Sequence, residues 1–300
     1  MNMSKFHTIT VCTDFSFGAL AAVERAAQLA MEHGATLCLL QAHGVPHTRS
    51  SSAMATDPLN ALGEHMSAEV GTLKAQQRLA ESASDLASRT GLRVESVLGM
   101  GPAHAVIREH IELRRPSLVV LGARFDITLA GIGGTVLKLM RSPGCPVLIV
   151  RNTKAGRYEH VLSAVDLRDS SVRAAVVALD LYPQSHHHLL YAVAPALDIS
   201  LEAGGISADQ VQSLHLAMHQ NAKRELLLLA KGFSTRSTHP VSAKVADDVP
   251  ARAVLVGAAS LQADCVVVGH HGAEEVGQTE LGSMALHVLQ FIPSDVLVVP

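Results

Sequence analysis

Short runs of apolar residues alternate along the chain with longer segments in which apolar residues recur every three or four positions. Most of the short runs are apolar throughout, which is typical of strands that are covered on both faces of a parallel sheet. The longer segments have the 3.6-residue spacing of amphipathic helices. This alternation predicts an α/β fold with doubly wound parallel sheets.

The apolar runs locate ten strands. They lie near residues 7–12, 36–42, 93–98, 117–121, 147–150, 160–165, 187–193, 241–245, 264–268 and 296–299. Two of the intervening helices have clear apolar stripes, which we expect to face the core. The stripes comprise Ala19, Val23, Ala26 and Ala30 in one helix, and Val211, Leu214, Met218, Ala222, Leu226 and Leu229 in the other.

The same succession of elements occurs twice, and matching landmarks appear in the same order in both halves. The matching pairs are Asp14 and Asp166, Gly122 and Gly269, Gly134 and Gly282, and the runs 147–150 and 296–299. Members of each pair are about 150 positions apart, so the chain contains two copies of one domain. The polar, Gly-containing stretch 151–157 has the composition of a linker. We predict domains at residues 1–152 and 153–300.

Composition excludes several classes of protein. Lys and Arg number 24 against 27 Asp and Glu, a formal net charge of −3, and no basic stripe occurs, which argues against a nucleic-acid-binding protein. No apolar run approaches the roughly 18 residues of a membrane helix, and no signal-peptide segment is present. The cysteines, Cys12, Cys38, Cys145 and Cys265, lack CxxC spacing and lie in apolar segments, which indicates reduced thiols. We expect a cytoplasmic protein that binds neither membrane nor nucleic acid.

Candidate chemistry gathers at the carboxyl ends of the predicted strands, where open parallel sheets bind ligands. In the second half, Asp166 ends the first strand, and the fourth strand is followed by the spacing Gly269-x2-Gly272-x9-Gly282-Ser283. Glycines let a backbone approach a polyanion closely, and a helix that begins at Gly-Ser offers N–H groups to phosphate. The alternative is that the glycines only form a tight turn between strand and helix.

The repeated aspartate, this glycine spacing and the terminal run 145–150 resemble the universal stress protein family. The resemblance covers essentially the whole chain, as two tandem domains. It implies a Rossmann-like sheet of strand order 3-2-1-4-5 in each domain and, in the nucleotide-binding branch of the family, bound ATP.

Carried over to this chain, the resemblance implies an adenine nucleotide (ATP, ADP or AMP, with or without Mg²⁺) in the C-terminal domain. The residues implied there, together with the two histidines of the same loop, are Asp166, Ala192, Gly269, His270, His271, Gly272, Gly282, Ser283 and Met284. The corresponding residues of the N-terminal domain are Asp14, Ala42, Gly122, Gly134, Thr135 and Val136.

The N-terminal copy departs from the family's pattern. Phe125 stands where the second glycine belongs, and eight residues rather than nine separate it from Gly134. A phenyl ring at that point would fill space meant for phosphate or sugar. We therefore expect one intact nucleotide site, in the C-terminal copy, and one degenerate site.

The 17 histidines raise the question of a metal site. His186, His187 and His188 are consecutive at the start of a predicted strand, where neighbouring side chains point to opposite faces. They cannot converge on one ion, so we predict no metal site formed by protein ligands alone. The chain also lacks a P-loop and a paired acid and base, so no catalytic residue is assigned.

Three functions remain open. The first is a stress-response module that binds ATP and signals to a protein partner yet to be identified. The second is a nucleotide-free scaffold that binds protein partners or a small apolar ligand. The third is a slow ATP hydrolase in which His270, His271, Glu274 or Glu275 orients water.

The last strand of each copy is a sheet edge that needs a cover. Single-domain proteins of the resembled family commonly dimerise by pairing these fifth strands. Because one chain tethers runs 147–150 and 296–299, we predict that they pair within the chain as a pseudo-dimer. A further homodimer is left open.

Overall fold

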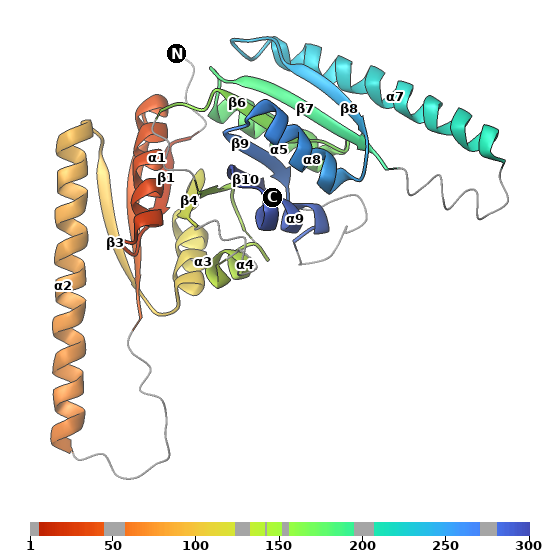
Figure 1. Cartoon of the computed structure of the whole chain (residues 1–300). Helices are drawn as coiled ribbons and strands as arrows, with labels where there is room; N and C mark the ends of the chain where they lie inside the picture. Colours follow the sequence, from red (N-terminus) through yellow and green to blue (C-terminus); the bar gives the residue numbers. More distant parts are fainter. Residues whose placement is uncertain are drawn as a thin grey trace. The chain divides into compact units, whose positions relative to one another are not determined.

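The chain forms two compact units. A computed structural model (Figure 1) describes residues 6–44, 58–123, 133–141, 143–151, 156–194, 207–270 and 281–300, with only the backbone given for 58–68. One unit comprises Met1–Gly122 and Gly134–Leu139, and the other comprises Ala123–Gly133 and Met140–Pro300. The last strand of the N-terminal copy therefore belongs to the second unit.

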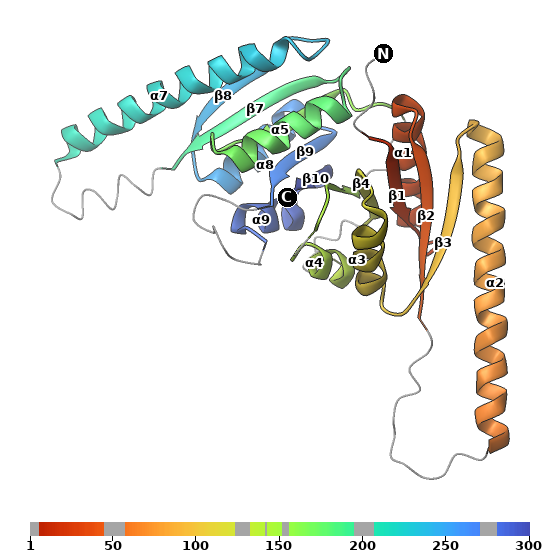
Figure 2. The same cartoon turned by 180° about the vertical axis from the view of Figure 1, so that it is seen from behind.

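Strands and helices alternate in the first unit. In chain order they are β1 (Thr8–Cys12), α1 (Phe17–His33), β2 (Thr36–His43), α2 (Pro58–Thr90), β3 (Val94–Met100), α3 (Ala103–Arg114), β4 (Leu118–Gly122) and α4 (Gly134–Leu139). The strands are parallel and lie in the order β3-β2-β1-β4. α1 packs on β1 and β4, α2 runs along β3, and α3 packs against α4 (Figures 1 and 2).

Local sequence signals fix both ends of α1. The Ser16 side chain accepts a hydrogen bond from the Ala19 N–H, which satisfies a donor at the start of the helix. Gly34 ends the helix with a φ of 63°, a left-handed conformation that glycine adopts without steric cost. The predicted alanine stripe faces the core, with Ala26 and Ala30 fully buried.

The second unit repeats the alternation. Its elements are β5 (Val147–Val150), β6 (His160–Ala164), α5 (Asp169–Leu181), β7 (His186–Val193), α7 (Ala208–Ser234), β8 (Ser242–Asp247), α8 (Pro250–Leu261), β9 (Cys265–Gly269), α9 (Ser283–Phe291) and β10 (Asp295–Val299). Their order in the sheet is β5-β10-β9-β6-β7-β8. All neighbours are parallel except β5 and β10, which are antiparallel.

This architecture confirms the predicted fold class. In the C-terminal copy the order β8-β7-β6-β9-β10 is the predicted 3-2-1-4-5, and the first four strands of the N-terminal copy follow the same order. The fifth strands pair within the chain, with Leu148 opposite Leu297, as predicted for a pseudo-dimer. Backbone hydrogen bonds between β5 and β10 thereby cover an edge that would otherwise be open to other chains.

The predicted stripe on α7 is wrong at two positions. Val211, Ala222 and Leu226 are buried, but Leu214 is 43% exposed and Met218 is 36% exposed. The next residue after each of these two, His215 and His219, lies on the inner face of α7 instead, beside Asp247 at the end of β8. A hydrogen bond from His215 Nε2 to Asp247 Oδ1 at 3.2 Å, with His219 Nε2 3.8 Å from Oδ2, lets histidine occupy the face that the apolar spacing assigned to Leu214 and Met218.

A buried polar cluster holds Arg151, at the end of the N-terminal copy, and Tyr158, at the start of the C-terminal copy, against the last helix and strand of the C-terminal copy. The Arg151 guanidinium donates to the carbonyl oxygens of Leu289 and Ile292 at the carboxyl end of α9, where a cation is favourable. The Asp295 carboxylate accepts from the Arg151 backbone N–H at 2.8 Å and from the Tyr158 hydroxyl. Burial lowers the pKa of Arg151 to about 10, while the Asp295 carboxylate opposes that shift.

The thiols agree with the prediction that they are reduced. All four cysteines are free; Cys38, Cys145 and Cys265 are buried, and Cys12 is partly buried. Burial raises the pKa of Cys145 to about 12 and that of Cys38 to about 11. Such thiols are poor nucleophiles at neutral pH because the thiolate is the reactive form.

Close packing against the backbone of α1 requires a residue without a side chain at Gly122. A Cβ added at this position would lie 2.2 Å from the Gly18 carbonyl oxygen and 2.7 Å from the Ala19 nitrogen. The start of α1 therefore packs directly on the end of β4. At Gly134, by contrast, an added Cβ would meet nothing within 4 Å.

We expect Gly122→Ala to lower the free energy of unfolding by about 2–3 kcal/mol, because backbone atoms cannot yield as a flexible side chain would. Gly134→Ala is the matched control and should change stability by no more than about 0.5 kcal/mol. Urea unfolding of both variants measures the difference. Equal effects of the two substitutions would contradict the packing explanation.

Candidate functional site

The predicted C-terminal site residues lie at one edge of the second unit's sheet. β6 pairs with β7 on one side and with β9 on the other. Asp166 follows β6, Ala192 is the second-to-last residue of β7, and Gly269 ends β9. Because these strands are parallel, their carboxyl ends meet at the same edge. The structure therefore brings these three residues to neighbouring positions.

This edge is also where the chain changes direction across the sheet. After β6 the chain continues to β7 and β8 on one side, whereas β9 and β10 lie on the other side. Asp166 and Gly269 end the two strands that flank this switch point. Ligands of open α/β sheets bind at such points, since the helices that follow the two strands diverge there.

The Asp166 carboxylate is held in one orientation by its neighbours. Its Oδ1 accepts hydrogen bonds from the Ser171 hydroxyl at 2.6 Å and from the Arg168 N–H at 3.1 Å. The Ser171 hydroxyl oxygen in turn accepts from the Asp166 N–H at 3.1 Å. Ser171 is 6% exposed and its two bonds to Asp166 are partly buried, whereas the bond from the Arg168 N–H is exposed.

Both copies carry a strained residue directly after this aspartate. Leu167 has a φ of 63°, and Phe15 has a φ of 60°. A bulky side chain in the left-handed region costs roughly 1–2 kcal/mol. The same strain at equivalent positions of the two copies shows that the turn after the aspartate is a fixed property of the domain.

α9 begins beside the carboxyl end of β9. The Gly282 N–H donates to the His270 carbonyl oxygen at 3.0 Å, and Gly282 is the N-cap of the helix. Gly282 itself makes no side-chain capping bond, because glycine has no side chain. Ser283 is exposed and Met284 is partly buried in the first turn. Backbone N–H groups and the positive end of the helix dipole therefore gather next to Gly269.

His270 has a different position from the one its sequence context suggests. It is 3% exposed, and its ring Nε2 donates a hydrogen bond to the Met140 carbonyl oxygen. The His270 backbone N–H donates a hydrogen bond to the Val299 carbonyl oxygen at 2.7 Å. The ring thus serves packing inside the second unit. His271 and Gly272 lie outside the described residues.

The N-terminal copy presents a weaker version of the same edge. Asp14 follows β1, Ala42 lies in β2 and Gly122 ends β4, so they also meet at the carboxyl ends of adjacent strands. Asp14 is exposed, and its Oδ1 accepts a hydrogen bond from the Ser16 N–H at 2.9 Å. Phe125 lies outside the described residues.

The helix that follows β4 is short. α4 has six residues, compared with nine in α9, and Gly134 and Thr135 form its first turn while Val136 is buried. A helix of less than two turns offers few aligned peptide dipoles. The site residues of the two copies therefore share positions in the fold but differ in what surrounds them.

The histidines at the start of β7 alternate as predicted, but the sheet adds partners that the linear sequence did not show. His187 is 1% exposed, while His186 and His188 lie on the other face. His188 Nε2 lies 3.1 Å from His160 Nδ1 on β6, and the ring of His186 stacks on His239 at 4.0 Å. Strand pairing creates this cluster at the end of the sheet opposite the candidate site.

Within the ranges that the structure describes, no group of three or more histidine, cysteine or acidic side chains is arranged to hold a metal ion. Likewise, none of the described helices is long and apolar enough to span a membrane.

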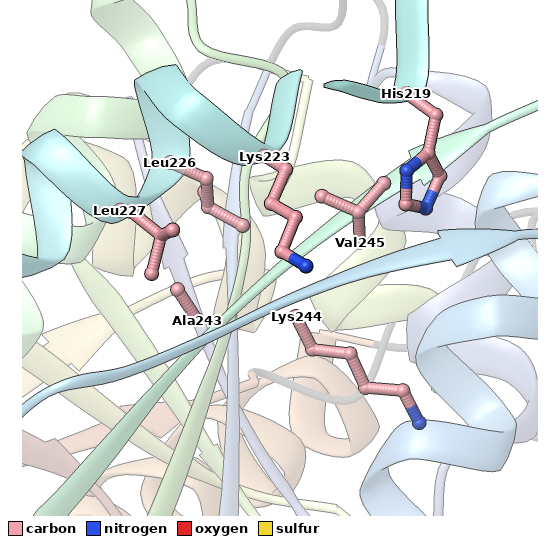
Figure 3. Close-up of a pocket in the computed structure, with 7 residues that line it drawn as sticks. All are labelled: His219, Lys223, Leu226, Leu227, Ala243, Lys244 and Val245. Atoms are coloured by element: carbon pink, nitrogen blue, oxygen red, sulfur yellow. The ribbon is translucent and has the colours of Figure 1, made fainter. Parts of the chain in front are cut away.

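A separate cavity of about 210 Å³ lies between α7 and β8. Figure 3 shows Leu226 and Leu227 of α7 facing Ala243 and Val245 of β8, with the Lys223 side chain reaching over the gap. None of the predicted site residues lines it. This cavity is therefore distinct from the strand-end site.

Fold and site together define a class of protein, the tandem α/β proteins with two doubly wound parallel sheets. The model of the universal stress protein family matches the chain twice, over residues 5–151 and 157–300. The chain belongs to the universal stress protein family, as its motifs predicted. The domain boundary at residues 152 and 153 stays a prediction.

Individual relatives agree with this assignment. Universal stress protein YxiE of Bacillus subtilis is 29% identical over 154 residues, which is 49% of this chain and 99% of that protein. A universal stress protein of Archaeoglobus fulgidus superposes with a TM-score of 0.64 at 18% identity, covering 97% of both chains. Protein PA1789 of Pseudomonas aeruginosa superposes with a TM-score of 0.59 at 16% identity, covering 98% of this chain and 92% of that protein. The two structures show the shared fold.

His187 gives the second unit a pH-dependent stability. Burial lowers the pKa of His187 from 6.5 to about 4, and its Nε2 donates to the Tyr182 carbonyl oxygen at 2.8 Å. As the pH falls, the unfolded chain takes up this proton before the folded chain does. The stabilisation is therefore complete above pH 6.5 and is lost progressively toward pH 4.

We expect the free energy of unfolding to fall by up to about 1.4 kcal/mol per pH unit in that window because of this group. His187→Gln, which keeps an N–H donor, should reduce the slope, and His7→Gln is the control at an exposed position. Urea unfolding midpoints of the wild type and both variants, measured between pH 7 and pH 4.5, test this pH dependence. An unchanged slope in His187→Gln would contradict this assignment.

Proposed function

We propose that the C-terminal copy binds an adenine nucleotide, with ATP as the expected form, and that occupancy regulates a cytoplasmic stress response. The observation that carries the proposal is the start of α9, a helix without a side-chain cap that begins at Gly282 beside the end of β9. The family resemblance supplies the class of ligand.

The residues at this edge fit the parts of a nucleotide. The Asp166 carboxylate can accept hydrogen bonds from hydroxyl or amino groups of the nucleoside. Ala192 has a small side chain at the end of β7, so a flat base can approach the backbone there. Gly269 and Gly282 leave room for phosphate, and Ser283 adds a hydroxyl and a backbone N–H.

Charge also favours phosphate at α9. The N-terminus of the helix carries the positive end of its dipole, and no acidic residue occupies the first turn. His270 contributes to the position of this helix start, because its backbone carbonyl oxygen accepts a hydrogen bond from the Gly282 N–H. Mg²⁺ that accompanies ATP needs no cage of protein ligands, since phosphates and water supply most of its coordination.

The proposal assigns no ligand to the N-terminal copy. α4 is short and Asp14 is exposed, so the two features that favour the C-terminal edge are both weaker there. In this proposal the N-terminal copy and a protein partner respond to whether the C-terminal site holds nucleotide. A protein partner and further dimerisation stay predictions.

ATP should stabilise the protein by about 2.7 kcal/mol when its concentration is one hundred times Kd. We expect Ser283→Pro to abolish most of this effect, because proline removes the N–H and the hydroxyl at the first helical position. Proline is compatible with that position, since Gly282 has the extended φ of −57° and ψ of 145° that a residue before proline requires. Thermal unfolding with and without ATP measures the effect.

Asp166→Ala and Asp14→Ala form a matched pair that compares the two copies. The first should weaken the ATP-dependent shift, and the second should leave it unchanged. Absorbance at 260 nm after denaturation reports nucleotide that copurifies. A protein without copurified nucleotide and with the same melting temperature in millimolar ATP would refute the proposal and favour the nucleotide-free scaffold.

A further inference from the structure

The two copies differ at one buried position beside the site aspartate. Asp14 and Asp166 are 152 positions apart, as are the strained residues Phe15 and Leu167, so this register relates the two turns. In the same register Ser171 corresponds to Ala19, and both are buried. The C-terminal copy therefore has a hydroxyl where the N-terminal copy has a methyl group.

The Ser171 hydroxyl forms hydrogen bonds with both the side chain and the backbone of Asp166. It donates to Oδ1 at 2.6 Å and accepts from the backbone N–H at 3.1 Å. The carbonyl oxygen of Arg168 is a second acceptor at 3.0 Å, but the shorter contact is the one expected for a hydroxyl that donates to a charged carboxylate. One side chain thus fixes the carboxylate relative to its own backbone.

The N-terminal copy uses serine differently. Ser16 caps α1 by accepting from the Ala19 N–H at 3.3 Å, and the Asp14 carboxylate receives the Ser16 N–H. In the C-terminal copy the equivalent N-cap residue is Arg168, whose side chain makes no capping bond. In the C-terminal copy the N-cap side chain therefore makes no capping bond, while a buried hydroxyl holds the aspartate.

We propose that Ser171 is a positioning residue that holds the Asp166 carboxylate in the orientation that receives the nucleoside. The N-terminal copy, to which the proposed function assigns no ligand, has Ala19 at this position and so lacks the hydroxyl. A carboxylate that is already oriented loses less rotamer freedom when it binds a ligand. This inference rests on the proposed function, because it concerns the same site.

The test compares wild type, Ser171→Ala, Asp166→Ala and the double variant by titration calorimetry with ATP. Ser171→Ala should raise the Kd for ATP about tenfold, in the range expected for a hydrogen bond to a charged group. In the Asp166→Ala background the same substitution should change Kd less than twofold, because its effect passes through the carboxylate.

Ser234→Ala is the matched control for loss of a partly buried helical hydroxyl. The Ser234 hydroxyl donates to the Ala230 carbonyl oxygen at 2.8 Å and accepts the Val241 N–H at 2.9 Å, far along the chain from the site residues. It should lower stability without changing the Kd for ATP. If Ser171→Ala behaved in the same way, Ser171 would be structural and the inference would be overturned.

A second measurement needs no ligand. Three-bond NMR couplings of Asp166 should report one χ1 rotamer in the wild type and averaging between rotamers in Ser171→Ala. Unchanged couplings would overturn the positioning role even if ATP binds. If the wild type binds no ATP, the proposed function fails, and the couplings still decide whether Ser171 fixes Asp166.

Discussion

The parallel pairing of β6 with β7 and β9 is the constraint on which the candidate site depends. Parallel strands that share a sheet must end at the same edge, so residues 166, 192 and 269 become neighbours although about a hundred positions separate the first from the last. The same pairing requires helical connections on both faces of the sheet. The fold and the site therefore have one physical origin.

Duplication has kept this constraint in both copies while the chemistry at the edge has diverged. Each copy retains an aspartate and a strained residue after its first strand, but only the C-terminal copy surrounds its aspartate with the buried Ser171 hydroxyl. The helix after the fourth strand is longer there, and its start bonds to the end of β9. Because β5 pairs with β10, the copies are joined through strands that neither candidate edge uses.

Several residues that suggested chemistry in the sequence also have structural roles, and the spacing of one helix was misleading. Gly122 admits the backbone of α1, and the His270 ring bonds to the Met140 carbonyl oxygen. The apolar spacing of α7 misplaced its inner face, because a hydrogen bond to Asp247 holds His215 there and Leu214 is exposed. In each case the deciding partner lies far away in the sequence, so no local pattern could reveal it.

The sequence by itself determined the strands, the duplication and the family, because periodicity and repeated motifs are properties of local order along the chain. It also located the glycines and the aspartate of the candidate site. Only the tertiary structure decided which of these residues are held in place and by what. The Ser171 hydroxyl is only five residues from Asp166, and the turn at Leu167 brings the two together. The hydrogen bond from the Gly282 N–H to the His270 carbonyl oxygen and the contact of His160 with His188 join more distant parts of the chain. Contacts of that kind depend on distance in space, which spacing along a chain does not specify.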